Sequence, residues 1–434
     1  MNILNKPLYF YLLLFITTTL IGSILLYLPI TGKRPIEFVD AFFIASSAFT
    51  VTGLATIDVS SQFNWLGDTI IMVLIQIGGL GIVTVTLLTF ILINKKISIK
   101  NRYLVMAMWN IDSPGGIIRL ILQFVLYSVV TEVVGALCIA LSFIPKYGLY
   151  KGTFLSIFTS VSAFNNAGFA LFKDNLMSTV NDPIITISVP LLIIMGGIGP
   201  LVFFDMVISQ KLIKLKLHSK IVLSSSLILI AVGTILFFIL DYQSSLNHLS
   251  LTEKLGASFF QSVTTRTAGF NTVDIGQISS PTAMVMMLLM FIGGGPISAA
   301  GGIKVTSFVL TLLFIKITLR NETHPSIFKK TIPERTLKIA VTITLLATVF
   351  VLSVSFILSM LNAQTPYTTI LFEVISAFGT VGLSMDFTTV YGTATKIIII
   401  VTMLIGKIGI LTFIQLFITE KKQLFHYAKD NVHL

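Results

Sequence analysis

The stretch Thr50-Val51-Thr52-Gly53-Leu54 decides how this chain folds: it is short and polar, contains one glycine, and lies between a short apolar segment and a long one. The pattern recurs as Asn165-Asn166-Ala167-Gly168-Phe169, Arg266-Thr267-Ala268-Gly269-Phe270 and Gly379-Thr380-Val381-Gly382-Leu383. We name these stretches pentapeptides 1 to 4. Each ends a run of roughly ten to twelve apolar and small residues, and a hydrophobic segment of membrane length follows each within about fifteen residues. Four copies predict a pore with four parts.

A second glycine-rich motif follows each pentapeptide at a near-constant distance along the chain. These second motifs are Gly78-Gly79-Leu80-Gly81, Gly196-Gly197-Ile198-Gly199, Gly293-Gly294-Gly295-Pro296 and Gly406-Lys407-Ile408-Gly409. Chance does not readily give such a register four times. We therefore interpret the chain as four repeats, at 1–102, 103–220, 221–335 and 336–419, followed by a tail at 420–434.

The composition is that of an integral membrane protein. Of the 434 residues, 55% are hydrophobic and 11% are charged, and the mean hydropathy is +0.95; a soluble domain carries about twice that charged fraction. The net charge of +11 does not indicate nucleic acid, because most Lys and Arg lie in short loops between hydrophobic runs. The single cysteine, Cys138, excludes an intramolecular disulfide and offers no metal cluster.

Each repeat reads as two spanning helices with a half-length helix between them. In the first repeat, residues 8–28 form a retained span rather than a signal peptide, and residues 66–93 form the second span. Residues 36–49 are too short to cross and run into pentapeptide 1, which predicts a re-entrant pore helix. Ser250-Leu251-Thr252-Glu253 predicts a capping box at the third pore helix, and Thr365-Pro366 predicts an N-cap followed by the first helical residue of the fourth. The fold class is therefore all-α.

Basic loops set the predicted orientation in the membrane. They hold Lys95, Lys96, Lys100 and Arg102 after the first repeat, and Lys211, Lys214, Lys216 and Lys220 after the second. Because cytoplasmic loops carry the excess of Lys and Arg, both clusters should lie inside the cell. The N-terminus, with Lys6, and the C-terminal tail are then also cytoplasmic, in a multi-pass protein of the plasma membrane.

The pentapeptides have the features of a cation filter. A potassium ion that enters a pore exchanges its water for protein oxygens, which rings of backbone carbonyls can provide. Aiming successive carbonyls inward requires backbone angles that glycine tolerates, and a pore helix directs the negative end of its dipole at the filter. The alternative is that these are ordinary helix-breaking glycines, or packing sites in a transporter. Four copies in register favour the filter.

These residues resemble the Trk/Ktr/HKT superfamily of potassium transporters, and within it the Ktr-type membrane subunit. The resemblance covers nearly the whole chain and implies four linked helix–pore helix–helix units around one pseudo-fourfold potassium-channel-like pore, two such subunits forming a homodimer. It also implies a bacterial source and a separate cytosolic, RCK-type (KtrA-like) nucleotide-binding ring subunit, since this chain has no G-x-G-x-x-G motif of its own. Potassium would contact the backbone carbonyls of Val51, Thr52, Asn166, Ala167, Thr267, Ala268, Thr380 and Val381.

The second span of the third repeat is abnormal. Residues 281–319 are more than a span needs, and Gly293-Gly294-Gly295-Pro296-Ile297-Ser298-Ala299-Ala300-Gly301-Gly302 interrupts them with poor helix formers. One interpretation is a kinked helix packed tightly on its neighbours. The other is a flexible loop below the filter that obstructs the pore, similar to the intramembrane gate of the resembled family, whose sequence is richer in hydroxyl groups. We expect the other three second spans to be unbroken.

Lys407 occupies the middle of the last span, where the first two repeats have glycine. A cation at the membrane centre costs at least about 2.5 kcal/mol, so Lys407 should face the pore or a partner rather than snorkel. We predict that it lies below the filter, contacts carbonyls of the gate and holds the closed state. The resembled family typically has arginine here; lysine keeps the charge and loses the planar fork.

Other charged residues near the predicted filter have less defined roles. Arg266 should point away from the ion path toward an acid, with Glu373 and Asp40 as candidates, because a cation lining the filter would repel the permeant ion. Glu132 and Asp205 are each either a buried polar contact or an ion-pathway residue.

The sequence thus predicts gated potassium uptake driven by the membrane potential, without a cofactor bound by this chain and with sodium coupling left open. The alternatives are a secondary transporter of another polar solute, with broken helices in paired repeats and a midplane cavity, and a less selective monovalent cation transporter. An enzyme is unsupported, because the five histidines are scattered and form no helical metal motif. Beside lipid, the ring subunit and a second copy are the expected partners, and nucleic acid is not.

Overall fold

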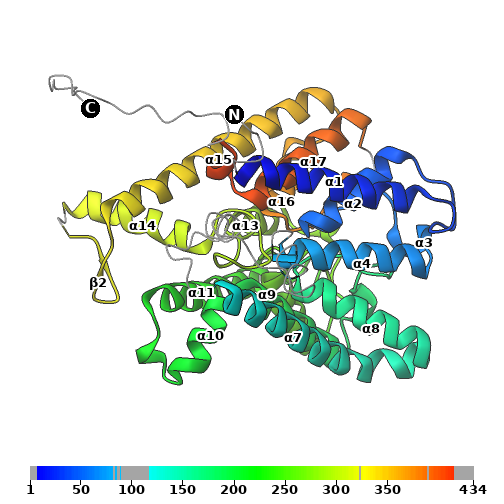
Figure 1. Ribbon diagram of the computed structural model, residues 1–434, viewed down its shortest axis with the longest axis horizontal. Helices are drawn as coiled ribbons and strands as arrows, with labels where there is room; N and C mark the ends of the chain where they lie inside the picture. The colour runs from blue at the N-terminus through cyan, green and yellow to red at the C-terminus, as the bar shows by residue number, and fades with distance from the viewer. Residues whose placement is uncertain are drawn as a thin grey trace.

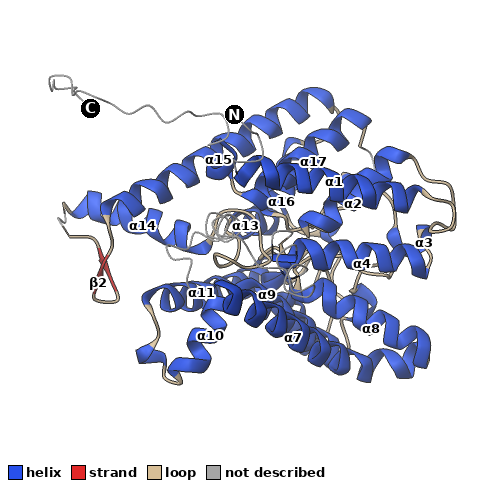
Figure 2. Ribbon diagram, viewed as in Figure 1, coloured by secondary structure: helices blue, strands red, loops and turns tan. Residues whose placement is uncertain are grey.

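The computed structural model describes residues 7–81, 84, 85, 88, 117–321, 324–388 and 391–414, and Figures 1 and 2 show that these are mostly helical, with loops and one short hairpin between the helices. The first two repeats contain α1 (Pro7–Tyr27), α2 (Phe38–Thr50), α3 (Val59–Gln62), α4 (Trp65–Leu80), α7 (Ile117–Tyr147), α8 (Leu149–Phe164), η2 (Met177–Thr179), α9 (Pro183–Ile198), α10 (Pro200–Ser209) and η3 (Leu212–Lys214). The last two contain α11 (Leu217–Leu240), α12 (Leu251–Thr264), η4 (Ile275–Gln277), α13 (Ser280–Phe291), α14 (Val305–Arg320), the hairpin β1 (Ser326–Ile327) and β2 (Lys330–Thr331), α15 (Glu334–Leu361), α16 (Tyr367–Gly379), α17 (Thr393–Ile408) and α18 (Ile410–Ile414).

The helices form an outer and an inner layer. Among the described residues, α7, α11 and α15 are long and apolar enough to cross a membrane. Their outer faces expose large apolar side chains, for example Leu141, Ile239 and Phe356, as expected for helices that lie against lipid. The four short helices α2, α8, α12 and α16 lie inside, and their C-terminal halves are buried almost completely. They are the predicted pore helices.

Contacts between consecutive repeats close the inner layer into a ring. Helix α4 packs on α8, α9 on α12, α13 on α16, and α17 returns to α2. In Figure 1 the helices α1, α2, α15, α16 and α17 lie on one side of the molecule and α7 to α11 on the other, with α13 near the centre and α14 beside α15. Helices α2 and α17, more than 300 residues apart in the sequence, thereby become neighbours.

The second spans are interrupted in the repeats where we expected continuous helices. Helix α4 ends at Leu80 and Gly81 follows with φ 81°; α9 and α10 meet at Gly199 with a bend of 94°; and α17 ends before Gly409, with φ 94°. The prediction that only the third second span is broken is therefore wrong. In repeats 1, 2 and 4 the last glycine of the second motif has a positive φ, which glycine adopts at little cost.

The third repeat breaks differently because its second motif ends in Pro296. Proline cannot adopt a positive φ, and the positive value appears instead at Ile297, with φ 58°. The chain between α13 and α14 then forms a loop of residues 292–304, which we name the gate loop. A β-branched residue at positive φ is an outlier, so neighbouring contacts have to maintain this conformation.

Of the two predicted helix starts, the one at α12 is confirmed and the one at α16 is displaced by one residue. Ser250 and Glu253 form both hydrogen bonds of a capping box at α12, which confirms that prediction. At α16 the N-cap is Pro366 rather than Thr365, and no side chain caps the helix. The predicted basic cluster at 95–102, Lys6 and the tail at 420–434 lie outside the described residues.

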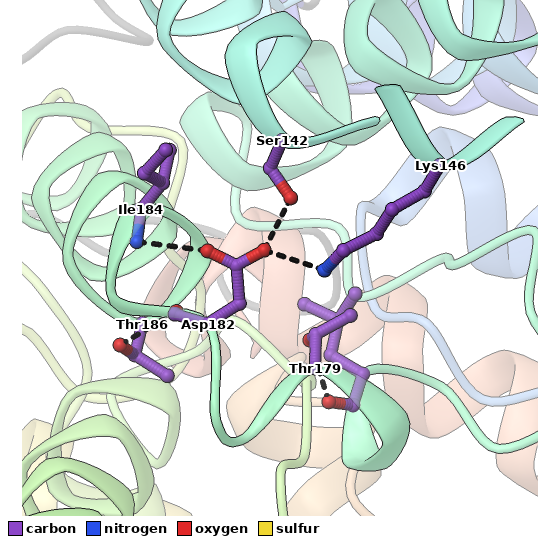
Figure 3. Close-up of polar contacts among 7 residues, drawn as sticks. Ser142, Lys146, Thr179, Asp182, Ile184 and Thr186 are labelled. Carbon is purple, nitrogen blue, oxygen red and sulfur yellow. Dashed lines mark hydrogen bonds and ion pairs between the residues drawn. The ribbon is translucent and has the colours of Figure 1, made fainter. Parts of the chain in front are cut away.

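At the rim of the second repeat, Asp182 joins the end of α7 to the start of α9 (Figure 3). Its carboxylate accepts the Ile184 N–H at 3.0 Å, forms an ion pair of 2.7 Å with Lys146, and accepts a short hydrogen bond from Ser142. Burial acts to raise the pKa of Asp182, but the bonds from Lys146 and Ser142 outweigh it, so the pKa lies below its usual value. The contact holds the outer span against the second span.

Candidate ion pore

Each pentapeptide begins where a pore helix ends, and its N–H groups turn back to that helix. In the first repeat the Thr52 N–H donates to the Ser47 carbonyl at 2.9 Å, and the Gly53 N–H donates to the Ser47 hydroxyl at 3.1 Å. In the fourth repeat the Val381 N–H donates to the Ser376 carbonyl at 2.8 Å, and the Gly382 N–H donates to the Ser376 hydroxyl at 3.1 Å. Since the N–H groups bond to the pore helix, the carbonyls between them face the opposite way, toward the centre.

The same pair of backbone conformations occurs in all four pentapeptides. Two residues have positive φ and one residue with negative φ separates them; the pairs are Val51 and Gly53, Asn166 and Gly168, Thr267 and Gly269, and Thr380 and Gly382. Changing the sign of φ at alternate residues turns successive peptide planes, so that neighbouring carbonyls point to the same side. Non-glycine residues rarely have positive φ, and four at one register indicate a functional constraint.

The four glycines face one another around a narrow axis. A Cβ added to Gly53 would lie 2.5 Å from the Ala167 carbonyl oxygen, and one added to Gly168 would lie 2.7 Å from the Ala268 carbonyl oxygen. A Cβ at Gly269 would meet the Val381 carbonyl, and one at Gly382 would meet the Thr52 carbonyl at a shorter distance still. Each repeat therefore contacts the next, and the fourth contacts the first, which closes the ring.

This ring brings backbone oxygens together without a fixed charge on them. The carbonyls of Thr52, Ala167, Ala268 and Val381, four of the eight predicted to contact potassium, lie at the level of the glycines. The pore helices direct their C-terminal ends at this level, and a helix C-terminus carries about half a negative charge. The arrangement attracts a small cation and repels an anion. That potassium binds here stays a prediction.

The first and second repeats share a polar contact behind pentapeptide 2. The Asn165 side chain donates to Gln76 at 2.9 Å and to Glu132 at 3.1 Å, and Ser128 donates to Glu132 at 2.8 Å. Glu132 is 8% exposed and is therefore a buried polar contact that holds pentapeptide 2 from behind. Asp205 likewise makes local contacts, accepting the Lys216 N–H at 2.9 Å.

The expected partners of Arg266 bind elsewhere, so that prediction is wrong. Asp40 pairs with Lys396 at 2.6 Å and accepts from Thr56, while Glu373 accepts hydrogen bonds from Ser384, Thr388 and Tyr391.

Arg266 itself lies at the C-terminal end of α12. Its N–H donates to the Val263 carbonyl, and its side chain is 8% exposed. Arg266 lines a cavity together with Ile193, Gly197 and Gly294, and its Nε has no hydrogen-bond partner among the described residues. The negative end of the α12 dipole provides an electrostatic partner in place of an acid.

The gate loop is attached to the repeats on both sides of it. Its base is closed by the Gly293 N–H, which donates to the Ile303 carbonyl at 2.8 Å. The Gly295 N–H donates to the Gly197 carbonyl of the second repeat at 2.8 Å, and the Gly302 N–H donates to the Gly406 carbonyl of the fourth repeat at 3.3 Å. The loop thus bridges the second motifs of its two neighbours.

The gate loop also lies directly against pentapeptide 4. A Cβ added to Gly302 would lie 3.2 Å from the Gly379 Cα, and one added to Gly301 would meet the Thr380 side chain. Lys407 makes the contact that the sequence predicts, since its Nζ donates to the Ala299 carbonyl at 2.7 Å. Its role in gating stays a prediction.

Sequence reasoning missed two kinds of residue in this pore. Ser47 and Ser376 hold the glycine N–H groups, and a serine six residues before the glycine, which Ser162 shares, was a signal that could have found them. Lys304 donates to the Ala300 carbonyl of the gate loop. No pattern pointed to it, because a lysine at a helix start usually faces water.

Comparisons with known proteins place this geometry among cation transporters. The family model TrkH, described as cation transport protein, matches residues 14–427. The chain is 42% identical over 422 residues to the Ktr system potassium uptake protein B of Bacillus subtilis, covering 96% of this chain and 94% of that protein. It is 37% identical to the potassium/sodium uptake protein NtpJ of Enterococcus hirae, covering 92% and 90%.

A solved structure supports the fold independently of close sequence similarity. The crystal structure of the potassium transporter TrkH from Vibrio parahaemolyticus matches with a TM-score of 0.73 at 17% identity, covering 95% of this chain and 85% of that chain. At this identity the match shows the fold alone.

Proposed function

The chain belongs to the TrkH family of cation transport proteins, and from this premise we propose that it takes up potassium ions across a bacterial plasma membrane through the pore that the four pentapeptides form. One observation carries the proposal: each pentapeptide glycine faces the carbonyl oxygen of the next repeat, so that the ring closes around one axis. A ring of this kind replaces the water around a dehydrated cation.

The pentapeptides select the ion by contacts that are mostly backbone. Four carbonyls at the glycine level, and the carbonyls of the four preceding residues with positive φ, replace the hydration shell of potassium as it passes. The ring needs a glycine in every repeat, because a Cβ would occupy the space of the neighbouring carbonyl. The membrane potential supplies the driving force, and no step requires a cofactor of this chain.

The gate loop decides when the ion passes. It lies against pentapeptide 4 and is attached to the second and fourth repeats, and Lys407 holds its Ala299 carbonyl. In the closed state it obstructs the path below the ring. Opening requires that the bond from Lys407 breaks so that the middle of the loop can move, which a partner outside the membrane can bring about through the helices that follow the breaks.

Two kinds of partner fit this scheme. A second copy of the chain forms a homodimer, and a cytosolic RCK-type ring subunit supplies nucleotide control. Relatives named as part of a Ktr system support a further component. Both chain ends lie in the cytoplasm in this arrangement.

A second candidate function is uptake of monovalent cations with weak selectivity. The relative from Enterococcus hirae is named as a potassium/sodium uptake protein, and sodium therefore enters the proposal as a competing or coupled ion. The closed glycine ring favours potassium, because it is rich in carbonyl oxygens and lacks carboxylates at the glycine level.

Rubidium uptake into proteoliposomes tests the proposal. Purified protein should take up rubidium when the membrane potential is inside-negative, potassium should compete strongly, and sodium weakly or as an activator. Equal competition by sodium and potassium would favour the second candidate. No uptake above that of protein-free liposomes, from protein that elutes as one folded species, would overturn both.

A further inference from the structure

Two lysines from different repeats hold neighbouring carbonyls of the gate loop. Lys407, on α17 of the fourth repeat, donates to the Ala299 oxygen, and Lys304, at the start of α14 in the third repeat, donates to the Ala300 oxygen. From this geometry we infer that Lys304 is a second positioning residue of the gate, acting with Lys407 to hold the loop closed. The inference rests on the proposed function.

The location of Lys304 separates it from an ordinary lysine at a helix start. It is the N-cap residue of α14 and is partly buried, although it provides no side-chain cap for that helix. Its side chain turns back to the loop instead, to a carbonyl four residues earlier. Ala300 is 2% exposed, so water cannot easily replace the ammonium group as a donor to this oxygen.

Within the part of the chain that the structure describes, backbone bonds and the Ser298 hydroxyl hold the rest of the gate loop, and charged side chains hold only the carbonyls of Ala299 and Ala300. Gly293, Gly295 and Gly302 anchor the loop through their N–H groups. The carbonyls of Ala299 and Ala300, between Gly295 and Gly302, are bonded to ammonium groups. Releasing the two lysines therefore frees the middle of the loop while its ends stay attached, as a hinged gate requires.

The two ammonium groups also repel each other. Because they bind the carbonyls of two adjacent residues, the two like charges lie close together, and neither forms an ion pair with a carboxylate among the described residues. Each lysine thus stabilises the closed loop through its hydrogen bond and destabilises it through the charge of the other. Removing one lysine loses one bond and also relieves the repulsion. Removing both loses two bonds and relieves the repulsion once.

The effects of the two substitutions should therefore be non-additive. Lys304→Met and Lys407→Met should each raise basal rubidium uptake by roughly tenfold or less, which is the order expected for one charge-assisted hydrogen bond reduced by repulsion. The double variant should exceed the product of the two increases. Lysines that each served only local packing would show no such coupling.

The experiment is a double-mutant cycle on the purified full chain in proteoliposomes, without a ring subunit. Basal rubidium uptake is measured for wild type, both single variants and the double variant, together with Lys304→Arg, which keeps the charge and should stay near wild type. Lys316→Met is the matched control, because Lys316 lies exposed on the same helix α14. Uptake by a variant lacking residues 297–300 sets the ceiling.

The possible outcomes distinguish this inference from the proposed function. If wild type shows potassium-sensitive uptake and Lys304→Met behaves like Lys316→Met, the inference fails and the proposed function stands. Increases that simply multiply in the double variant would also overturn it, because the shared loop segment requires coupling. If no variant, including the loop deletion, shows uptake, the proposed function itself fails. Should Lys304→Met not fold, Lys304→Gln takes its place in the cycle.

Discussion

At the level of the pentapeptides the four repeats are equivalent, whereas one layer below, at the second motifs, the third repeat differs from the other three. All four pentapeptides have the same pair of positive φ values and the same glycine contact with the next repeat. Below them, Gly81, Gly199 and Gly409 end their helices in a left-handed conformation, and Pro296 stands at the matching place in the third repeat.

The difference follows from what each layer has to do. In the proposed function the pentapeptides coordinate one ion from all sides, which requires equal groups at equal distances and tolerates little variation between repeats. A gate needs only one movable part, and breaking the symmetry in a single repeat is enough. In repeats 1, 2 and 4 the first glycine of the second motif instead packs on a pore-helix carbonyl, at Phe49, Phe164 and Phe378. The corresponding Gly293 contacts the carbonyl of Gly301 in its own loop.

The largest effect is expected from altering one of the four equivalent pentapeptides. In Gly53→Ser the new Cβ would lie 2.5 Å from the Ala167 carbonyl oxygen, so pentapeptides 1 and 2 must move apart. We expect the discrimination of potassium from sodium in liposome flux to fall by about tenfold or more, a loss of roughly 1.4 kcal/mol of differential binding.

Gly256→Ser provides the control for this substitution. Gly256 lies in α12, and no atom lies within 4 Å of a Cβ added there. Its flux and selectivity should match those of wild type. Unchanged selectivity in Gly53→Ser would contradict the assignment of the ring as the filter.

The second effect concerns the gate loop, where the third repeat differs from the other three. Deleting residues 297–300 removes the carbonyls that both lysines hold and leaves Gly295 and Gly302 to anchor the ends. If the loop obstructs the pore, basal rubidium uptake should rise by about tenfold or more while selectivity stays that of wild type. Reduced or equal uptake, in protein with an unchanged elution profile, would mean that the loop supports the pore instead of closing it.

A smaller increase is expected from Lys407→Ala. The substitution removes one charge-assisted hydrogen bond to Ala299 and leaves the backbone anchors in place, and such a bond contributes about 1.5–3 kcal/mol before the repulsion of Lys304 is subtracted. Basal uptake should rise severalfold and remain below that of the loop deletion. A silent variant would make Lys407 a packing residue alone.

The smallest effect should come from the ion pair of Asp182 and Lys146, which contacts neither the pentapeptides nor the gate loop. Asp182→Asn keeps an N-cap for α9, since Asn and Asp are equally good caps, and removes the ion pair with Lys146. Flux should be unchanged, and stability in detergent at neutral pH should fall by about 1 kcal/mol or less, as for other half-exposed pairs.

The pH dependence of this pair has a definite sign. The pKa of Asp182 lies below the ordinary 3.8 in the folded protein, so the pair stabilises the protein above about pH 4 and the contribution is lost as the pH falls through the folded pKa. The difference in thermal unfolding between wild type and Asp182→Asn should therefore shrink on acidification. A difference that persists at acidic pH would assign the effect to local packing.

Which features could be foreseen depended on how far apart in the chain their causes lie. The pentapeptides and the capping box at Ser250 are visible in a few consecutive residues, because a short helix, a glycine and a second span follow one another directly. The breaks at Gly199 and Gly409 were present in the second motifs but were not recognised, because Gly is common in membrane helices and does not by itself indicate a left-handed residue.

The contacts of charged residues were the least foreseeable. Asp40 pairs with Lys396 at the other end of the chain, and Lys407 bonds to a carbonyl 108 residues earlier. Arg266 was expected to find an acid and instead lies at a helix C-terminus beside a cavity. Several buried charges could pair with several partners, and only packing decides which of them come within hydrogen-bond distance.

By itself, the sequence determined that this protein is a membrane protein of four repeats with a glycine in every pentapeptide, because hydrophobic length and backbone freedom are properties of short segments. The tertiary structure alone decided that the glycines face their neighbours in a closed ring and that Lys304 and Lys407 hold adjacent carbonyls of the gate loop. These features depend on distances between segments a hundred or more residues apart, which no local pattern specifies.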